Sequence, residues 1–113
     1  MIKGNFKRDA DGHLVQFTLT GHADSGPYGS DLVCAAVSAL AISTVNGLEA
    51  LAGFTPEVIS DNQNGGYLSM SLISGMSGEQ VNISQILLEN LLLGLQSVAA
   101  ENQKYLTVQT INE

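Results

Sequence analysis

The sequence contains a single cysteine, no tryptophan and only four basic residues. One cysteine cannot form a disulfide within the chain, which excludes the small disulfide-rich scaffolds of secreted proteins. Four Lys and Arg residues against eleven Asp and Glu give a formal net charge of −7. A basic nucleic-acid-binding surface is therefore not expected. An acidic surface instead favours basic partners.

Long apolar segments and metal-ligand clusters are also lacking. The N-terminal residues contain no apolar signal core. The longest apolar run, Ile86–Leu95, contains Glu89 and Asn90 and is too short to span a bilayer. One cysteine and two histidines do not make a structural zinc site without recruited carboxylates. We therefore expect a cytoplasmic protein with no membrane segment and no bound metal.

The sequence does contain enough apolar material for one core. Its 113 residues are 44% hydrophobic, close to the average of globular proteins. This length argues for one domain that spans residues 1–113. No linker, internal repeat or low-complexity segment divides the chain.

The first half of the chain predicts a hairpin followed by a helix. Residues 2–8 and 13–20 alternate between apolar and polar and flank the turn signal Asp-Ala-Asp-Gly. After a loop, a helical pattern covers residues 31–52, and either Asp31 or Ser30 is its expected N-cap. The apolar stripe predicted for this helix consists of Val33, Val37, Leu40, Thr44, Leu48 and Leu51.

The second half repeats this order and adds a final strand. A second hairpin within residues 55–74 turns at an Asn-Gly pair. The second helix begins near Gly78, or only at Ser84, and ends near Gln103, before a strand over residues 104–112. Its predicted stripe is Leu87, Leu88, Leu91, Leu95 and Val98, with Ile86, Leu92 and Leu93 outside it.

The order of elements is β-β-α-β-β-α-β, which predicts an α+β fold. We expect two layers, with a five-stranded, mostly antiparallel sheet and both helices on one of its faces. The apolar residues outside the second stripe exceed what one sheet face can cover. Contact with the first helix or with a partner subunit would bury them.

The lone cysteine lies where it could act as a nucleophile. With Asp31 as the N-cap, Cys34 is the third helical residue, where free backbone N–H groups favour a thiolate. His22 follows the second strand, and its imidazole could take the proton of the sulfur. Ser38 shares a helix face with Cys34 beside the apolar stripe. The alternatives stay open: free cysteines commonly only pack, and a lone histidine is commonly structural.

The segment Gly21–Leu40 resembles the signature of the ribosomal-processing cysteine protease family, Prp. That signature is Gly-His-Ala at a strand end, then a short loop, then Gly-x-Asp-hydrophobic-Val-Cys-Ala-x-Val-Ser at the opening of a helix. The chain matches it from Gly21 to Ala23 and from Gly29 to Ser38. A weaker likeness extends along the whole chain, including Asn46 and the Leu-rich stretch before the last strand.

The resemblance implies a function that composition alone does not indicate. The family removes the N-terminal extension of a large-subunit ribosomal protein, number twenty-seven, and acts as a homodimer without a metal or organic cofactor. It implies that Cys34 is the nucleophile and His22 the general base and acid. Asp31 is then a third catalytic member or only a helix cap, and Ser38 lines the substrate groove.

Two other functions fit the same residues. The first is a non-enzymatic module, in which Cys34 is inert and an acidic face binds a basic ribosomal or assembly protein. The second is a small-molecule amidase that uses the same pair. Rapid alkylation of Cys34 separates the first alternative from the protease, and a requirement for an extended peptide separates the second.

Overall fold

The computed structural model describes residues 1–21, 28–61 and 66–113, and the side chains of residues 28–31 are outside this description. The order of elements is the predicted one. The elements are β1 (Ile2–Arg8), β2 (Leu14–Thr20), α1 (Tyr28–Gly47), a π-helical turn (Leu48–Ala52), β3 (Glu57–Asp61), β4 (Tyr67–Ser71), α2 (Gly78–Glu101) and β5 (Leu106–Asn112).

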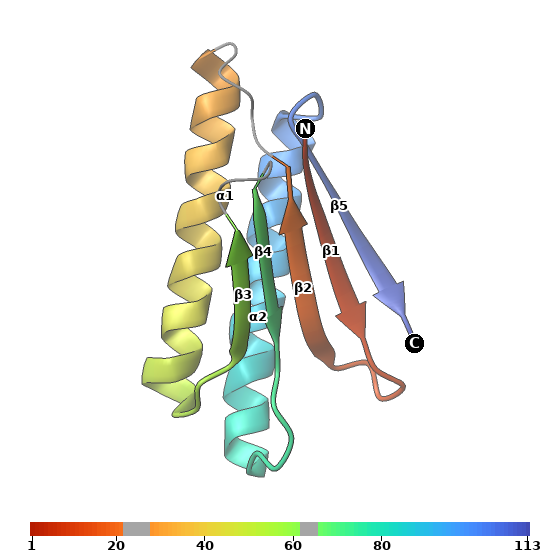
Figure 1. The fold of residues 1–113 in the computed structure, drawn as a ribbon. Helices are drawn as coiled ribbons and strands as arrows, with labels where there is room; N and C mark the ends of the chain where they lie inside the picture. Colours follow the sequence, from red (N-terminus) through yellow and green to blue (C-terminus); the bar gives the residue numbers. More distant parts are fainter. Residues whose placement is uncertain (22–27, 62–65) are drawn as a thin grey trace.

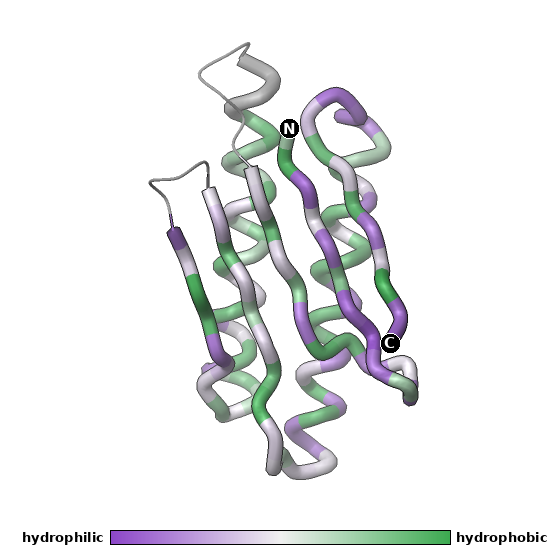
Figure 2. Tube along the Cα trace, turned by 45° about the vertical axis from the view of Figure 1, so that its right-hand side comes forward, coloured by the Kyte–Doolittle hydropathy of each residue, from purple (hydrophilic) through white to green (hydrophobic). Residues whose placement is uncertain are grey.

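The five strands form one sheet in the order β3-β4-β2-β1-β5. Each neighbouring pair is antiparallel except β1 and β5, which run parallel. Figures 1 and 2 show both helices on the same face of the sheet, with α1 nearer to β3 and α2 behind the central strands. The predicted α+β architecture with a mostly antiparallel sheet is therefore confirmed.

The core lies between this sheet face and the helices. Phe6 on β1 is directly opposite Phe17 on β2, and their rings stack with centroids 5.7 Å apart. The side of the first helix that faces the sheet contributes Val33, Val37 and Ala41 to the core. Burial of these apolar surfaces holds the helices on the sheet.

Helix α1 begins earlier than the sequence analysis predicts. Its first residue is Tyr28, so Asp31 lies within the first turn and the assignment of Asp31 or Ser30 as N-cap is wrong. Acidic residues are also favourable within the first turn, where the helix dipole is positive. An Asp at position 31 is therefore compatible with a helix that starts before it, and its capping preference does not fix the start.

Two leucines also differ from their predicted sides. The sequence pattern predicts that Leu51 is buried, but Leu51 is 65% exposed, because the last turn of the first helical segment is π-helical and therefore wider than an α-helical turn. The sequence pattern predicts that Leu92 lies outside the apolar stripe of the second helix, but its side chain is only 5% exposed. Helix α2 contacts both the sheet and α1, so its buried surface is broader than one stripe.

The start of α2 at Gly78 has a clear local cause. Ser77 accepts a hydrogen bond at its side chain from the backbone N of Gln80, at 3.1 Å. The Gln80 side chain in turn accepts from the backbone N of Ser77, at 3.0 Å. This capping box satisfies two backbone donors at once. Of the two predicted starts, Gly78 is therefore confirmed.

Residues 32–52 and 78–101 are long and apolar enough to cross a membrane by length and composition. Core helices of globular proteins meet the same criterion. Both helices here pack on the sheet, through residues such as Val37 and Leu88. The criterion alone therefore does not indicate a membrane-spanning role.

An ion pair ties the end of β1 to α2. Arg8 donates from Nη1 and Nη2 to the two carboxylate oxygens of Glu89, at 2.6 and 2.9 Å. The hydrogen bonds from Arg8 hold the pKa of Glu89 below its usual range. Burial opposes this with a smaller effect, and the charge of Arg8 adds a still smaller lowering of the pKa. A bidentate pair of this kind is stronger than a single surface contact.

We predict that Glu89→Gln lowers the free energy of unfolding at pH 7 by about 1 kcal/mol, a value reduced for the solvent exposure of the Glu89 side chain. The folded pKa of Glu89 is depressed, so its stabilisation is present above the ordinary carboxyl pKa and is lost as the pH falls through the folded pKa. Urea unfolding from pH 7 down to about pH 3 measures this loss.

The matched control is Glu113→Gln, which removes the exposed partner of Lys7. It should change the free energy of unfolding by less than about 0.5 kcal/mol. Equal losses in the two variants, or a Glu89→Gln difference that persists at acid pH, would contradict the role assigned to the Arg8–Glu89 pair.

Candidate active site

Cys34 lines a cavity of about 280 Å³ between α1 and one end of the sheet. Helix α1 forms one wall, and the ends of β1, β2, β3 and β4 supply the other. The described residues that line the cavity are Ile2, Leu19, Gly21, Cys34, Val37, Ser38, Ala41, Ile42, Ser60, Gly66, Tyr67 and Leu68. Ordinary binding pockets have this form, with a largely apolar lining and a few polar groups.

The helix geometry decides which residues of α1 reach this cavity. Val33 and Val37 are buried against the sheet, and Cys34 follows Val33 around the helix, so it is only partly buried. Ser38 and Ile42 come four and eight residues after Cys34 and lie on the same side. The expectation that Cys34 is partly accessible beside Ser38 is therefore confirmed.

Cys34 does not lie in the first helical turn, however. It is the seventh residue of α1, because the helix begins at Tyr28. The expectation that it occupies the third position is wrong. The free N–H groups and the dipole effect are concentrated in the first turn. The helix terminus alone therefore supplies little stabilisation to a thiolate at Cys34.

Two glycines close the end of the cavity where the hairpins meet. The backbone N–H of Gly21 donates to the carbonyl oxygen of Gly66, at 3.0 Å. Gly21 directly follows β2 and precedes His22 in the sequence, whereas Gly66 directly precedes β4. Both adopt positive φ angles, of 92° and 79°. This contact joins the chain that leads to His22 to the second hairpin.

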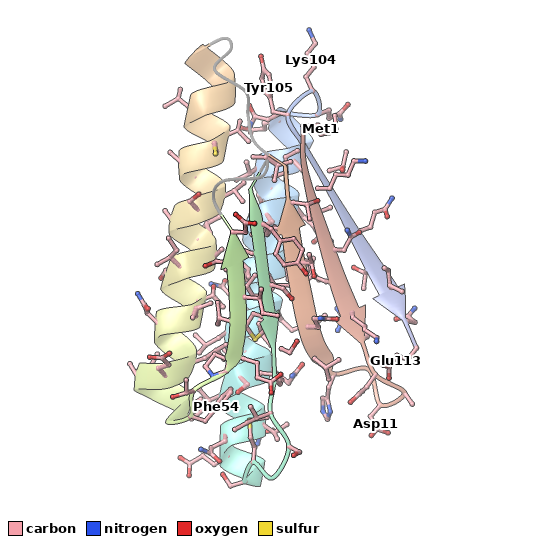
Figure 3. The ribbon with its side chains drawn as sticks, in the orientation of Figure 1. Met1, Asp11, Phe54, Lys104, Tyr105 and Glu113 are labelled. Carbon is pink, nitrogen blue, oxygen red and sulfur yellow. The ribbon has the colours of Figure 1, made fainter. Side chains whose placement is uncertain are left out.

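The two histidines occupy different parts of the chain. His13 lies in the turn before β2, where its Nδ1 is 3.9 Å from Asp9 Oδ2. Figure 3 labels Met1 at the end of the sheet that borders the cavity and Asp11, in the same turn as His13, at the opposite end. An imidazole for Cys34 would therefore have to come from His22, which lies outside the described residues.

The cavity lining carries no ionisable group other than Cys34 and Tyr67 among the residues that the structure describes. Across the same described ranges, no group of three or more His, Cys, Asp or Glu side chains is arranged to hold a metal ion. The described part of the cavity wall therefore presents the Cys34 thiol beside hydroxyl and apolar groups.

The structure brings together some of the predicted residues. Cys34 and Ser38 line one cavity. Asp31 is placed on the backbone of α1, three residues before Cys34 and hence on the same side of the helix, but its side chain is outside the description.

Sequence reasoning overlooked other residues of the cavity wall. Ile42 could have been found by continuing the four-residue spacing from Cys34 and Ser38. Ser60, Tyr67 and Leu68 could not, because their places depend on how β3 and β4 pair and on where α1 crosses them.

Comparisons with known proteins find a family model and several relatives that match most of the chain. The sequence model of the family described as cysteine protease Prp matches residues 1–107. The ribosomal processing cysteine protease Prp of Bacillus subtilis is 32% identical over 110 residues, which cover 97% of this chain and 97% of that protein.

Solved structures show the same fold. A crystal structure of a Streptococcus mutans protein is 39% identical, with a TM-score of 0.90, and the match covers 100% of this chain and 96% of that one. The ribosomal processing protease Prp of Staphylococcus aureus, solved with a covalently linked product peptide, is 27% identical. Its TM-score is 0.81, and the match covers 97% of this chain and 99% of that one.

The cavity geometry predicts that Ser38→Leu slows modification of Cys34 by a thiol reagent several-fold, because a larger side chain on the same helix face narrows the approach to the sulfur. Mass spectrometry of the protein during reaction with iodoacetamide measures the rate. Ser43→Leu is the control, since Ser43 is exposed on α1 but does not line the cavity. Similar rates in the two variants would show that the sulfur is reached from elsewhere.

Proposed function

Because the chain belongs to the cysteine protease Prp family, we propose that it removes the N-terminal extension of a large-subunit ribosomal protein, number twenty-seven. Cys34 is the nucleophile in this proposal, and His22 is the general base and acid. The observation that carries it is the shared cavity: Cys34 and Gly21, the residue directly before His22, line the same space. Consecutive Cα atoms are ~3.8 Å apart, so His22 follows directly from a cavity-lining position.

The proposed reaction uses two protein groups, the thiol of Cys34 and the imidazole of His22. His22 accepts the proton of the Cys34 thiol, and the sulfur attacks the scissile carbonyl carbon. The imidazolium then gives that proton to the leaving amine as the peptide C–N bond breaks, which leaves a thioester on Cys34. His22 then takes a proton from a water molecule, whose oxygen attacks the thioester carbonyl carbon. The C–S bond breaks, and the imidazolium returns the proton to the sulfur, which restores the thiol and the neutral imidazole. No metal or organic cofactor takes part in this sequence.

Asp31 is assigned the third role in the proposal. Its position inside the first turn of α1 removes the N-cap assignment, and its three-residue spacing places it on the same side of the helix as Cys34. A carboxylate there would accept a hydrogen bond from the imidazole and hold the ring in the tautomer that the reaction needs. Asp31 is thus a positioning residue for His22.

The cavity supports a peptide substrate with apolar residues near the scissile bond, and the overall charge supports a substrate protein that is basic. The cavity wall offers apolar side chains such as Val37, Ile42 and Leu68 and a hydroxyl at Ser38. Apolar side chains near the scissile bond would be desolvated there. The net charge of −7 would accelerate encounter with a basic ribosomal protein. Ser38 is therefore proposed as part of the substrate groove.

The proposal includes a homodimer in the cytoplasm, where ribosomal precursors are made. Large apolar side chains on the helices support a further subunit contact. Ile86 and Leu93 on α2 are 70% and 63% exposed, and Leu32 on α1 is 53% exposed. Exposed apolar groups of this size are typical of surfaces that another protein covers. No nucleic acid or membrane is part of the proposal.

The first test is the conversion of the ribosomal precursor from the same organism, followed by mass spectrometry. The unmodified protein should release the N-terminal extension, and Cys34→Ala should release none while its thermal unfolding midpoint stays within a few degrees. Ser43→Ala, on the same helix but outside the cavity, should cleave normally. Cleavage by Cys34→Ala would remove Cys34 from the reaction. A precursor that binds but is never cut would indicate the non-enzymatic module.

The second test concerns the base. His22→Ala should lower the rate of cleavage by roughly 10²–10⁴-fold, the usual contribution of a general acid–base residue. Single-turnover kinetics with excess enzyme measures the chemical step. His13→Ala is the matched control and should retain the parental rate, because His13 lies at the other end of the sheet. If His22→Ala kept the parental rate, the base would have to be another group.

A further inference from the structure

The end of β2 has a feature that the proposed chemistry does not yet explain. Gly21 adopts a φ of 92°, in the region that residues with a side chain rarely enter. Its N–H is fixed by the hydrogen bond to the Gly66 carbonyl. The direction in which the chain leaves β2 toward His22 is therefore set by one backbone conformation.

The space beside Gly21 is filled by main chain. A Cβ atom at this position would overlap the carbonyl oxygen of Met1, and it would lie 3.2 Å from the carbonyl carbon of Met1 and 3.5 Å from Cα of Ile2. Figure 3 labels Met1 at this end of the sheet. A flexible side chain could move aside, but these are backbone atoms.

The obstructing backbone is held firmly in place. The backbone N of Ile2 donates to the carbonyl oxygen of Tyr105, at 2.8 Å, and the Ile2 side chain is buried at 3% exposure. Ile2 also pairs with Leu106 on β5. A side chain at position 21 would therefore have to displace either the start of β1 or the backbone of Gly21 itself.

Other positive-φ glycines lack this constraint. Gly12 and Gly75 have φ angles of 86° and 79°, yet a Cβ at either would meet no atom within 4 Å. At Gly53 only the far end of the Gln80 side chain comes near. Among the positive-φ glycines whose surroundings the structure describes, Gly21 alone is closed in by backbone, and it also lines the cavity of Cys34.

We propose that Gly21 is a positioning residue for the Cys34–His22 pair: the bare Cα lets the Met1 main chain close against it, and this contact, with the Gly66 hydrogen bond, fixes how the chain delivers His22. The inference rests on the proposed function. A displacement of about 1 Å between reacting groups can lower a rate by about 10²-fold. Gly21 thus acts on the reaction through His22, without touching the substrate bond itself.

The experiment compares Gly21→Ala and Gly21→Asn with Gly12→Ala and Gly12→Asn. Asn tolerates positive φ better than Ala, so backbone strain alone would make the Asn variant milder at either glycine. A collision of Cβ with Met1 instead penalises both substitutions at Gly21. We expect kcat on the precursor to fall about 10²-fold in both Gly21 variants while KM changes little, and both Gly12 variants to keep the parental kcat.

Alkylation of Cys34 at neutral pH is the second readout. In both Gly21 variants it should slow toward the rate of His22→Ala, because the imidazole no longer holds the thiol proton. A change of fold stability alone would not produce this slowing in protein that remains folded. Parental kcat in Gly21→Ala, or a loss of kcat with parental alkylation, would overturn the assignment.

A chain that begins at Ile2, released from a cleavable fusion, tests the contact itself. Without the Met1 carbonyl, Gly21→Ala should cost at least tenfold less in kcat than in the full chain. An equal cost in both chains would overturn the proposal. So would a Gly21→Ala protein that fails to fold in both chains, since Gly21 would then serve the fold alone. Parental protein that cannot cleave the precursor would instead refute the proposed function.

Discussion

The packing of α1 on the sheet is the constraint on which the site depends. Val33 and Val37 must face the sheet, because together with the rest of the inner side they bury the apolar surface that holds the helix in place. The helical repeat then leaves no choice for Cys34, which must lie beside this inner side and remain partly exposed. The same repeat places Ser38 and Ile42 in line with Cys34. A core requirement thus fixes the position of the candidate nucleophile.

Much of this arrangement follows from sequence patterns of short range. Alternation predicts the hairpins, and the Ser77 and Gln80 pattern accounts for the start of α2. The errors arise where a local pattern competes with its surroundings. Asp31 is a good cap residue, yet the helix starts before it, and Leu51 follows the helical repeat until the π-helical turn rotates it outward. The cavity was beyond prediction, because its walls come from five separate elements whose distances no spacing encodes.

The Arg8–Glu89 ion pair and the cavity of Cys34 lie at opposite ends of the sheet. At one end, Arg8 of β1 pairs with Glu89 of α2 and ties the two layers together through charged groups. At the other end, the main chain of Met1 and of Ile2, where β1 begins, lies against Gly21, and the described residues that line the cavity carry no ionisable group other than Cys34 and Tyr67. The ion pair that ties the two layers together therefore lies away from the cavity of Cys34.

The late position of Cys34 in α1 makes the proposed imidazole more important. Cys34 lies six positions after Tyr28, a rise of about 9 Å along the axis, and the dipole effect is confined to the first turn. A helix terminus therefore cannot substitute for a base at this sulfur. The described cavity wall offers no other group that would take its proton near neutral pH. Activation then depends on His22, and the precision of that activation depends on how the backbone at Gly21 is held.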